Sequence, residues 1–573
     1  MELLKEGPKA PKDPTKKRKS FYIMRGKEIA ASPQPDGRGI QFIYQNDGRL
    51  ISSARLVGNI TDEKILGLLR DTEGFRKLVH SIGVTVEADN SEQYVNFVFQ
   101  MYGKSDVYGS GTSLEMPVKA DGMEYILNLE EQEWSEDDDI PGQTRFEFKK
   151  AGELARVSVR FYLQDGFDVP EPAPEKEVDF SCPEYEEMRR RAVIQLGNTG
   201  RLRSAMERGR AGEDITIAFI GGSVTQGAGA IPINTQCYAY KTFAGLCKLL
   251  GKGVDENIHY IKAGVGGTPS ELGMIRYERD VLREGTVEPD IVVVEFAVND
   301  AGDETNGHCY ESLVRKIYES DNKPAVVLEF AVFADDYNLQ DRLSPVGVGY
   351  HLPMVSTKDM VLEQFYKKPQ EGRVVSKNQF FYDSYHPSNI GHTMMADGLL
   401  QLFSQVLVKE EKPEITLTEV PVLSDAFWQV QLLDKRRNEC GAVICPGDFT
   451  EVDEELQAVE MDMNLNVTKE FPYNWMYCGS RRGNAEYRPF TMDIECESLF
   501  LVFKDSAANH VGKAEVYVDG ELCLVADPRI NGWTHCNALI VFRERERKLY
   551  HVEVRMRKGD EEKDFTILGF GYV

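Results

Sequence analysis

One serine near the middle of the chain has neighbours suited to a nucleophile. The segment 221–227, GGSVTQG, directly follows the apolar run 215–220. Glycines ahead of Ser223 let the backbone turn tightly and leave its hydroxyl facing solvent. A phosphate-binding loop is the alternative for a glycine-rich turn, but no Lys-Ser or Lys-Thr pair directly follows the glycines and no GxGxxG spacing fits. We therefore predict that Ser223 acts as a nucleophile.

A histidine able to activate this serine stands in the segment 383–387, DSYHP. Asp383 precedes His386 by three residues on a tight loop, so its carboxylate can reach the Nδ1 proton and fix the tautomer whose Nε2 accepts a proton from serine. His392 is a rival, but it falls inside a helix predicted to start near Ser388, and we interpret it as structural. A metal site built from these side chains is the less favoured alternative, because no third His or acidic ligand sits at helical spacing. We expect neither a metal nor a cofactor.

Two further segments supply hydrogen-bond donors. The segment 263–270, AGVGGTPS, places glycines between a strand and a helix, where backbone amides can converge on an anion. Asn299 and Asp300 follow the strongly apolar run 291–296, so the Asn299 amide can donate into a crevice while Asp300 caps the following segment. Taken alone, each segment is also consistent with an ordinary turn.

The elements that precede these segments predict a parallel α/β sheet. Apolar, β-branched runs alternate with helical patterns, as in a sheet buried on both faces; the runs are 215–220, 259–261, 291–296 and 325–330. One helix fits 238–250, where Phe243, Leu246 and Leu250 recur at helical spacing before Gly251 offers a stop. Open α/β sheets bind ligands at the carboxyl edge of their strands. We therefore expect the four segments to meet at that edge.

Together the four segments resemble the ordered blocks of the SGNH (GDSL-like) hydrolase superfamily, with Ser in the first, Gly in the second, Asn in the third and DxxH in the last. The resemblance covers the middle of the chain. It implies Ser223 as nucleophile, His386 as base and Asp383 as the residue that orients the base. It also implies an oxyanion hole formed by the Ser223 amide, the Gly267 amide and the Asn299 side chain.

One position departs from the family pattern. Many members have Asp before the nucleophile, where this chain has Gly222. Glycine also occurs there in esterase branches, so the departure weakens the subfamily assignment more than the chemistry.

A chain of 573 residues is too long for one hydrophobic core. We expect a disordered tail at 1–20, an N-terminal β-sandwich at 21–165 and a linker rich in Pro and acidic residues at 166–180. A three-layer α/β/α, flavodoxin-like SGNH hydrolase domain is expected at 181–410, and a second β-sandwich of jelly-roll type at 411–573.

Composition restricts the partners. The chain has 67 Lys plus Arg against 93 Asp plus Glu and a formal net charge of −26, which repels phosphate backbones and anionic lipids. The basic run 16–19 stands alone and is interpreted as solvated tail. No stretch has the features of a signal peptide or of a membrane span, and the ten cysteines show no common zinc or redox spacing. We expect a cytoplasmic, bacterial protein with reduced thiols that binds neither nucleic acid nor membrane; the oligomeric state is not predicted.

The resemblance implies a serine esterase that works through an acyl-enzyme. An SGNH domain between two β-sandwiches is similar to bacterial carbohydrate esterases that remove O-acetyl groups from xylan- or mannan-type oligosaccharides. Trp475 and Trp533 are candidates to stack on a sugar ring, the alternative being core or edge packing. A small ester needs only triad and oxyanion hole, so we expect the C-terminal domain to matter more for oligosaccharides. The alternatives are a general carboxylesterase, lipase or thioesterase and, from a different class, a non-catalytic carbohydrate-binding protein.

Overall fold

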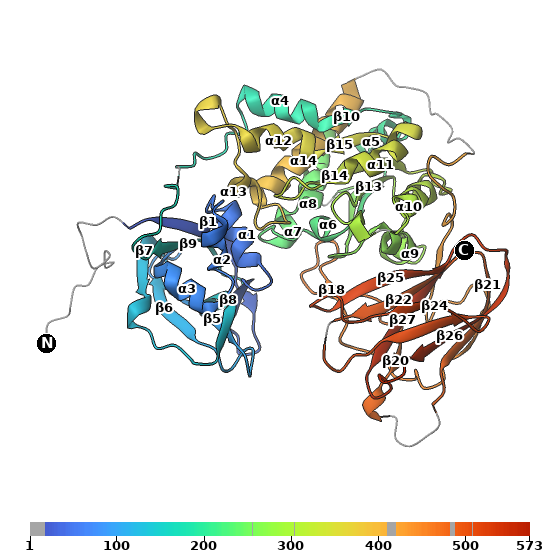
Figure 1. Ribbon diagram of the computed structural model, residues 1–573. Coiled ribbons are helices and arrows are strands. Elements are labelled where there is room, and N and C mark those ends of the chain that lie inside the picture. Colours follow the sequence, from blue (N-terminus) through green and yellow to red (C-terminus); the bar gives the residue numbers. More distant parts are fainter. Residues whose placement is uncertain are drawn as a thin grey trace.

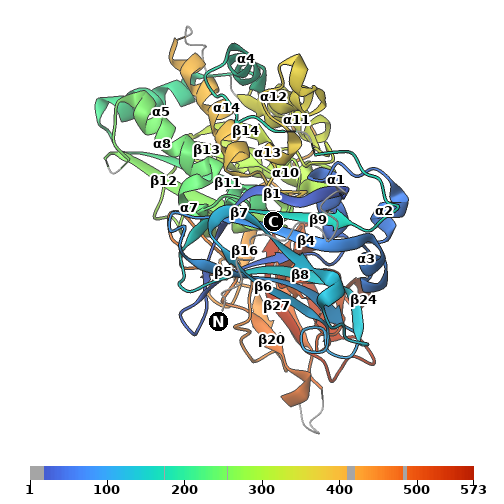
Figure 2. The ribbon, with the colours of Figure 1, turned by 90° about the vertical axis from the view of Figure 1, so that its left-hand side faces the viewer.

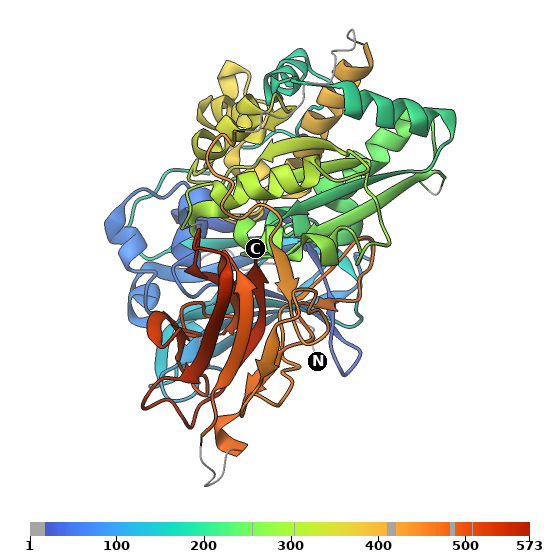
Figure 3. The same cartoon turned by 90° about the vertical axis from the view of Figure 1, so that its right-hand side faces the viewer.

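The computed structural model describes residues 18–172, 174–254, 256–302, 304–408, 420–481, 487–506 and 508–573. Three modules are visible in Figure 1: an N-terminal module from β1 to β9, a central module from α4 to α14 and a C-terminal module from β16 to β27. Both flanking modules lie on the same side of the central module, as the views from either side also show (Figures 2 and 3). The predicted tail lies outside the described residues up to position 17, as does the predicted boundary at 410–411; Ser20 already belongs to β1.

The central module is a six-stranded sheet in the order β10-β15-β14-β13-β11-β12. Its strands are β10 (Val193–Gln195), β11 (Ile215–Gly221), β12 (Ile258–Gly264), β13 (Ile291–Glu295), β14 (Ala325–Phe330) and β15 (Met354–Ser356). The last five are parallel and follow the 2-1-3-4-5 order of flavodoxin-like folds, while β10 is antiparallel at the edge. All four predicted strands are present. The two that were not predicted have only three residues each, too few to show a periodicity.

Helices cover both faces of this sheet. Ile217 and Phe219 face a core shared with α5 (Gly200–Ala211), α8 (Tyr238–Leu250), α14 (Asn389–Val408), α4 (Pro183–Ala192) and α12 (Thr357–Tyr366). Ala218 and Ile220 face the opposite core, with α9 (Ser270–Asp280), α10 (His308–Tyr318) and α11 (Gln340–Gly349). This alternation along one strand gives three layers. The predicted helix 238–250 has the predicted bounds, and Gly251 ends it with a φ of 73°.

The N-terminal module consists of two antiparallel sheets around one core. The first contains β1 (Ser20–Ala30), β9 (Leu154–Leu163), β4 (Val79–Glu87) and β7 (Asp121–Asn128); the second contains β2 (Ser32–Pro33), β3 (Gly39–Tyr44), β8 (Asp138–Phe148), β5 (Tyr94–Gly103) and β6 (Ser113–Lys119). Three short helices were not predicted: α1 (Arg49–Leu56), α2 (Glu63–Gly67) and α3 (Thr72–Leu78). Helix α1 lies on the side of the module that faces the central module (Figure 1).

The C-terminal module contains two sheets of five strands each. One contains β16 (Gln431–Leu433), β20 (Trp475–Tyr477), β22 (Leu499–Asp505), β25 (His535–Phe542) and β27 (Phe565–Tyr572); the other contains β17 (Val443–Cys445), β21 (Phe490–Cys496), β23 (Ala514–Val518), β24 (Glu521–Ala526) and β26 (Lys548–Met556). A separate hairpin joins β18 (Ala458–Val459) and β19 (Thr468–Lys469). Along β22, Leu501 and Phe503 face the second sheet, whereas Phe500 and Val502 face the core that contains α9. The first sheet is therefore fastened to the central module by apolar packing.

None of the helices in the described ranges combines the length and apolar composition needed to cross a bilayer. All ten cysteines lie within those ranges, and none forms a disulfide.

Candidate active site

The first residues of the site follow the ends of two neighbouring strands, at the switch point of the sheet. Ser223 opens the single-turn helix α6 (Ser223–Gln226) directly after β11, and Asn299 lies in the turn after the neighbouring strand β13. The buried guanidinium of Arg276 on α9 donates to Gly221 O at 2.9 Å and to Ala263 O at 2.8 Å. It thereby ties together the ends of β11 and β12, where ligands of such sheets bind.

The loop between α13 (Lys377–Phe380) and α14 brings His386 to the serine. His386 Nε2 lies 3.0 Å from Ser223 Oγ, and its Nδ1 donates to Asp383 Oδ2 at 2.9 Å. Asp383 Oδ1 accepts the backbone amides of Tyr385 and His386, both at 2.8 Å. A bridge between Phe381 and Pro387 closes the base of this loop. The arrangement leaves Nε2 free to accept the serine proton.

The two titratable partners shift each other in the expected directions. Burial alone would raise the pKa of Asp383, but the nearby His386 and the hydrogen bonds that the carboxylate accepts lower its pKa to about 2. Burial acts to lower the pKa of His386, and Asp383 more than offsets this, so that the pKa lies above the usual 6.5. The histidine is therefore a stronger base than an isolated imidazole.

Backbone amides beside the serine are available to an anion. In the described part of the chain, neither the Ser223 amide nor the Gly267 amide donates to a protein acceptor. Gly267 has a φ of 71°, a conformation that favours glycine. A Cβ on Gly222 would lie 2.1 Å from Asn299 Oδ1, so glycine at this position lets the Asn299 side chain lie against the serine turn.

Side chains of the C-terminal module hold the loop that carries Gly267. His535 Nε2 donates to Gly267 O at 2.9 Å, and Gln457 Nε2 donates to Gly266 O at 2.8 Å. Gln226 of α6 accepts the Gly266 amide at 3.1 Å. Sequence reasoning missed these three side chains. Gln226 belongs to the quoted serine segment, but nothing in the sequence links Gln457 or His535 to the site.

The two candidate tryptophans occupy different environments. The Trp533 side chain is 46% exposed, and a Cβ on Gly267 would lie 2.8 Å from its Cζ2, so the indole lies beside the Gly267 loop. Trp475 is only 4% exposed, and its ring packs 5.3 Å from that of Phe490 in the core between the two C-terminal sheets. Trp475 has no face free for a sugar ring, so its prediction as a binding residue is wrong.

Two further residues highlighted by the sequence have structural contacts. His392 is buried, and its Nδ1 accepts the Tyr238 amide while its Nε2 donates to Ala228 O, both at a distance of 3.1 Å. Burial lowers the pKa of His392 to about 3. Asp300 accepts the amide and the hydroxyl of Ser270, the first residue of α9. Among the described residues, no group of three or more His, Cys, Asp or Glu side chains is arranged to hold a metal ion.

Known structures resemble the chain although no family model and no curated protein matches it. A two-domain esterase (CEX) active on acetylated mannans matches with a TM-score of 0.56 and 25% identity, over 67% of this chain and 98% of that one. The same type of esterase co-crystallised with mannopentaose matches with a TM-score of 0.55 and 26% identity, over 67% of this chain and 97% of that one. The four segments and this likeness are those of an SGNH (GDSL-like) serine hydrolase, and the two solved structures that the chain resembles are esterases.

Proposed function

We propose that this protein removes O-acetyl groups from acetylated plant oligosaccharides of the mannan or xylan type. The observation that carries the proposal is the chain of hydrogen bonds from Asp383 through His386 to Ser223, with distances of 2.9 and 3.0 Å. In the described residues, neither the Ser223 amide nor the Gly267 amide donates to a protein acceptor, and a Cβ on the neighbouring Gly266 would lie 3.7 Å from Ser223 Cβ, which supports a role for both amides in binding an oxyanion. The arrangement suits acyl transfer from an ester.

The chemistry follows from the positions of these groups. His386 Nε2 takes the proton of Ser223 Oγ as the oxygen attacks the ester carbonyl, and Asp383 stabilises the imidazolium that forms. The developing oxyanion accepts hydrogen bonds from the amides of Ser223 and Gly267 and from the Asn299 side chain, each contributing about 2.7–4 kcal/mol. His386 then protonates the departing sugar oxygen. Water, activated by the same imidazole, releases acetate from the acetyl-enzyme.

Two observations besides the fold support a carbohydrate substrate: the structural neighbours and an exposed tryptophan. The structural neighbours include an esterase active on acetylated mannans, and its counterpart was crystallised with mannopentaose. Trp533 offers an exposed indole next to Gly267, where a sugar ring bearing the acetyl group would extend. We assign the two C-terminal sheets to a jelly-roll module that contributes this wall, and the N-terminal sheets to a β-sandwich.

The test has two stages. Hydrolysis of an aryl acetate and an aryl octanoate by wild type and Ser223→Ala decides whether the protein is a serine esterase for short acyl groups. Ser223→Ala should abolish turnover and labelling by an organophosphate without lowering the melting temperature, because the hydroxyl contributes little packing. Preference for the octanoate would favour a lipase instead. Mass spectrometry of acetylated manno- and xylo-oligosaccharides then identifies the substrate, since each deacetylation replaces an acetyl group with hydrogen.

A further inference from the structure

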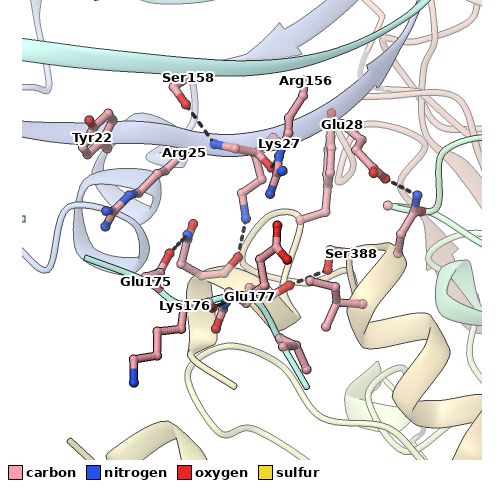
Figure 4. Close-up of a pocket in the computed structure, with 18 of the residues that line it drawn as sticks. Tyr22, Arg25, Lys27, Glu28, Arg156, Ser158, Glu175, Lys176, Glu177 and Ser388 are labelled. Carbon is pink, nitrogen blue, oxygen red and sulfur yellow. Dashed lines mark hydrogen bonds between the residues drawn. The ribbon is translucent and has the colours of Figure 1, made fainter. Parts of the chain in front are cut away.

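A lysine of the N-terminal module reaches the back of the loop that carries Asp383 and His386. A cavity of about 500 Å³ lies between strand β1, the segment 175–180 and the start of α14. Figure 4 shows the Lys27 side chain extending from β1 of the N-terminal module toward the central module. The side chain belongs to a module that supplies none of the three residues of the proposed triad.

The lysine ammonium donates to backbone carbonyls at the base of the loop. Lys27 Nζ donates to Asn378 O at 2.6 Å and also to Phe381 O. Asn378 is the second residue of the four-residue helix α13, whose last carbonyls lack partners within the helix, and Phe381 directly follows that helix. Phe381 is also the residue whose bridge to Pro387 closes the loop. One ammonium therefore holds the start of the segment on which Asp383 and His386 stand.

The surroundings keep this cation charged although it is buried. Lys27 is only 5% exposed, and burial lowers its pKa to about 8 although the carboxylates of Glu175 and Asp383 act to raise it. Glu175 is itself held in place by Asn378 Nδ2 at 2.7 Å and by the Ser376 hydroxyl. Burying a cation is costly unless hydrogen bonds and charges offset the cost. Here the compensating groups all lie at or beside the catalytic loop.

We propose that Lys27 is a positioning residue for the acid–base half of the active site. By holding the carbonyls of Asn378 and Phe381, it fixes the base of the loop so that His386 Nε2 stays within reach of Ser223 Oγ. This inference rests on the proposed esterase function. It gives the N-terminal module a role in the chemical step for every ester substrate, including esters too small to contact a flanking module.

The experiment compares three substitutions at Lys27 with a matched control in the same cavity. Lys27→Met removes the donors at similar length, Lys27→Gln keeps a shorter amide donor, and Lys27→Arg keeps the charge and donors with the cavity offering room for the larger head. Lys176 lines the same cavity but is exposed, and Figure 4 shows its side chain directed away from Lys27, so Lys176→Met is the control. Rates on an aryl acetate are divided by the amount of organophosphate-reactive Ser223, which counts only folded active sites.

Lys27→Met should lower kcat about 10- to 100-fold, because a displacement of about 1 Å in catalytic geometry has effects of this size. KM should change less than about twofold, since the hydrogen bonds that Lys27→Met removes do not involve the substrate. Lys27→Arg should restore most of the rate, Lys27→Gln should lie between, and Lys176→Met should match wild type. Should Lys27→Met not fold, Lys27→Gln decides. A kcat within about twofold of wild type in a folded Lys27→Met or Lys27→Gln protein would overturn the proposal.

Hydrogen exchange separates this inference from the esterase assignment. Amides of 381–387 should exchange faster in Lys27→Met than in wild type, whereas Lys176→Met should leave them unchanged. If the esterase assignment itself is wrong, wild type shows neither turnover nor Ser223 labelling, yet the exchange difference persists. If only the inference is wrong, wild type is active and the exchange of this segment is the same in all variants.

Discussion

The two flanking modules contact opposite halves of the proposed active site, and they do so differently. The N-terminal module inserts a buried ammonium, Lys27, behind the loop that carries Asp383 and His386. The C-terminal module uses neutral side chains, His535 and Gln457, to bind the carbonyls of the Gly266-Gly267 loop. The C-terminal module also places the exposed indole of Trp533 beside Gly267, a proposed oxyanion donor.

The difference separates two requirements of acyl transfer. Proton transfer depends on the distance and basicity of His386, which the N-terminal contact can alter. Stabilisation of the oxyanion depends on where the Gly267 amide points, which the C-terminal contacts can alter. Changes in the two halves should therefore have different kinetic effects. A change in the Asp383-His386 half should shift the pH profile, whereas a change in the oxyanion half should lower kcat without shifting the pH profile.

The largest effect should come from Asp383→Asn, in the acid–base half. An amide cannot hold the required tautomer of His386, so kcat should fall by about 10⁴-fold. In wild type, kcat/KM should rise with pH through a pKa above 6.5, because protonated His386 cannot act as base and Asp383 raises its pKa. In Asp383→Asn, burial without the carboxylate should move this limb to lower pH. Rate profiles between about pH 5 and 9 test both points, and an unshifted limb would contradict the assigned pair.

Asn299→Ala should have the next largest effect and should leave the pH limb where it is. Loss of one oxyanion donor lowers kcat by roughly 10²–10³-fold with little change in KM, since the bond forms mainly in the transition state. Asn299→Asp should be at least as damaging, because a carboxylate repels the developing negative charge. Melting temperatures measured beside the kinetics are the control. A collapsed melt with normal activity in the folded fraction would make Asn299 purely structural.

The contacts from the C-terminal module should matter for small esters as well as for oligosaccharides. His535→Ala and Gln457→Leu should each lower kcat on an aryl acetate about tenfold, because both release a carbonyl of the Gly266-Gly267 loop. His551 is exposed and bound to Asp493, so His551→Ala is the matched control. Unchanged aryl acetate rates would restore our first expectation, that this module serves mainly larger substrates.

A double variant sharpens the comparison of the two halves. Lys27→Met and His535→Ala act on separate loops, so their losses in kcat should multiply, as expected for independent sites. A combined loss no greater than that of either single variant would mean that the two modules act through one shared element.

Sequence patterns sufficed where the determinants are local. The run 291–295 is buried on both faces and therefore reads as a continuous apolar strand, and the helix 238–250 carries its own apolar stripe and its terminal Gly251. The Asp383-His386 spacing likewise lies within one loop. In contrast, His535 lies 268 positions from Gly267, and Lys27 lies 351 positions from Asn378. Neither His535 nor Lys27 belongs to the four ordered segments that link Ser223 to His386, so no sequence pattern connects these two residues to the site.

Burial in the sandwich core was equally inaccessible to sequence reasoning. Trp475 and Trp533 both stand in turn-rich stretches, yet β20 is only three residues long and directs Trp475 into the core beside Phe490. A three-residue strand shows too little alternation to indicate which side chains face inward. The short helix α1 escaped prediction for a similar reason, since only Leu50 and Ala54 of its residues are buried.

The smallest effect is expected from a change at Trp533, which should distinguish oligosaccharide from small ester substrates and leave the chemical step unchanged. Trp533→Ala should raise KM for an acetylated oligosaccharide about two- to tenfold, the size of a single aromatic contact of roughly 0.5–1.5 kcal/mol, while an aryl acetate should be turned over within about twofold of the wild-type rate. Trp428 is the matched control, since it is partly exposed but has its ring beneath Arg315. Equal losses on both substrates would mean that the indole acts by supporting Gly267. An unchanged KM for the oligosaccharide would remove Trp533 from the sugar-binding wall and leave the C-terminal module with the oxyanion loop alone.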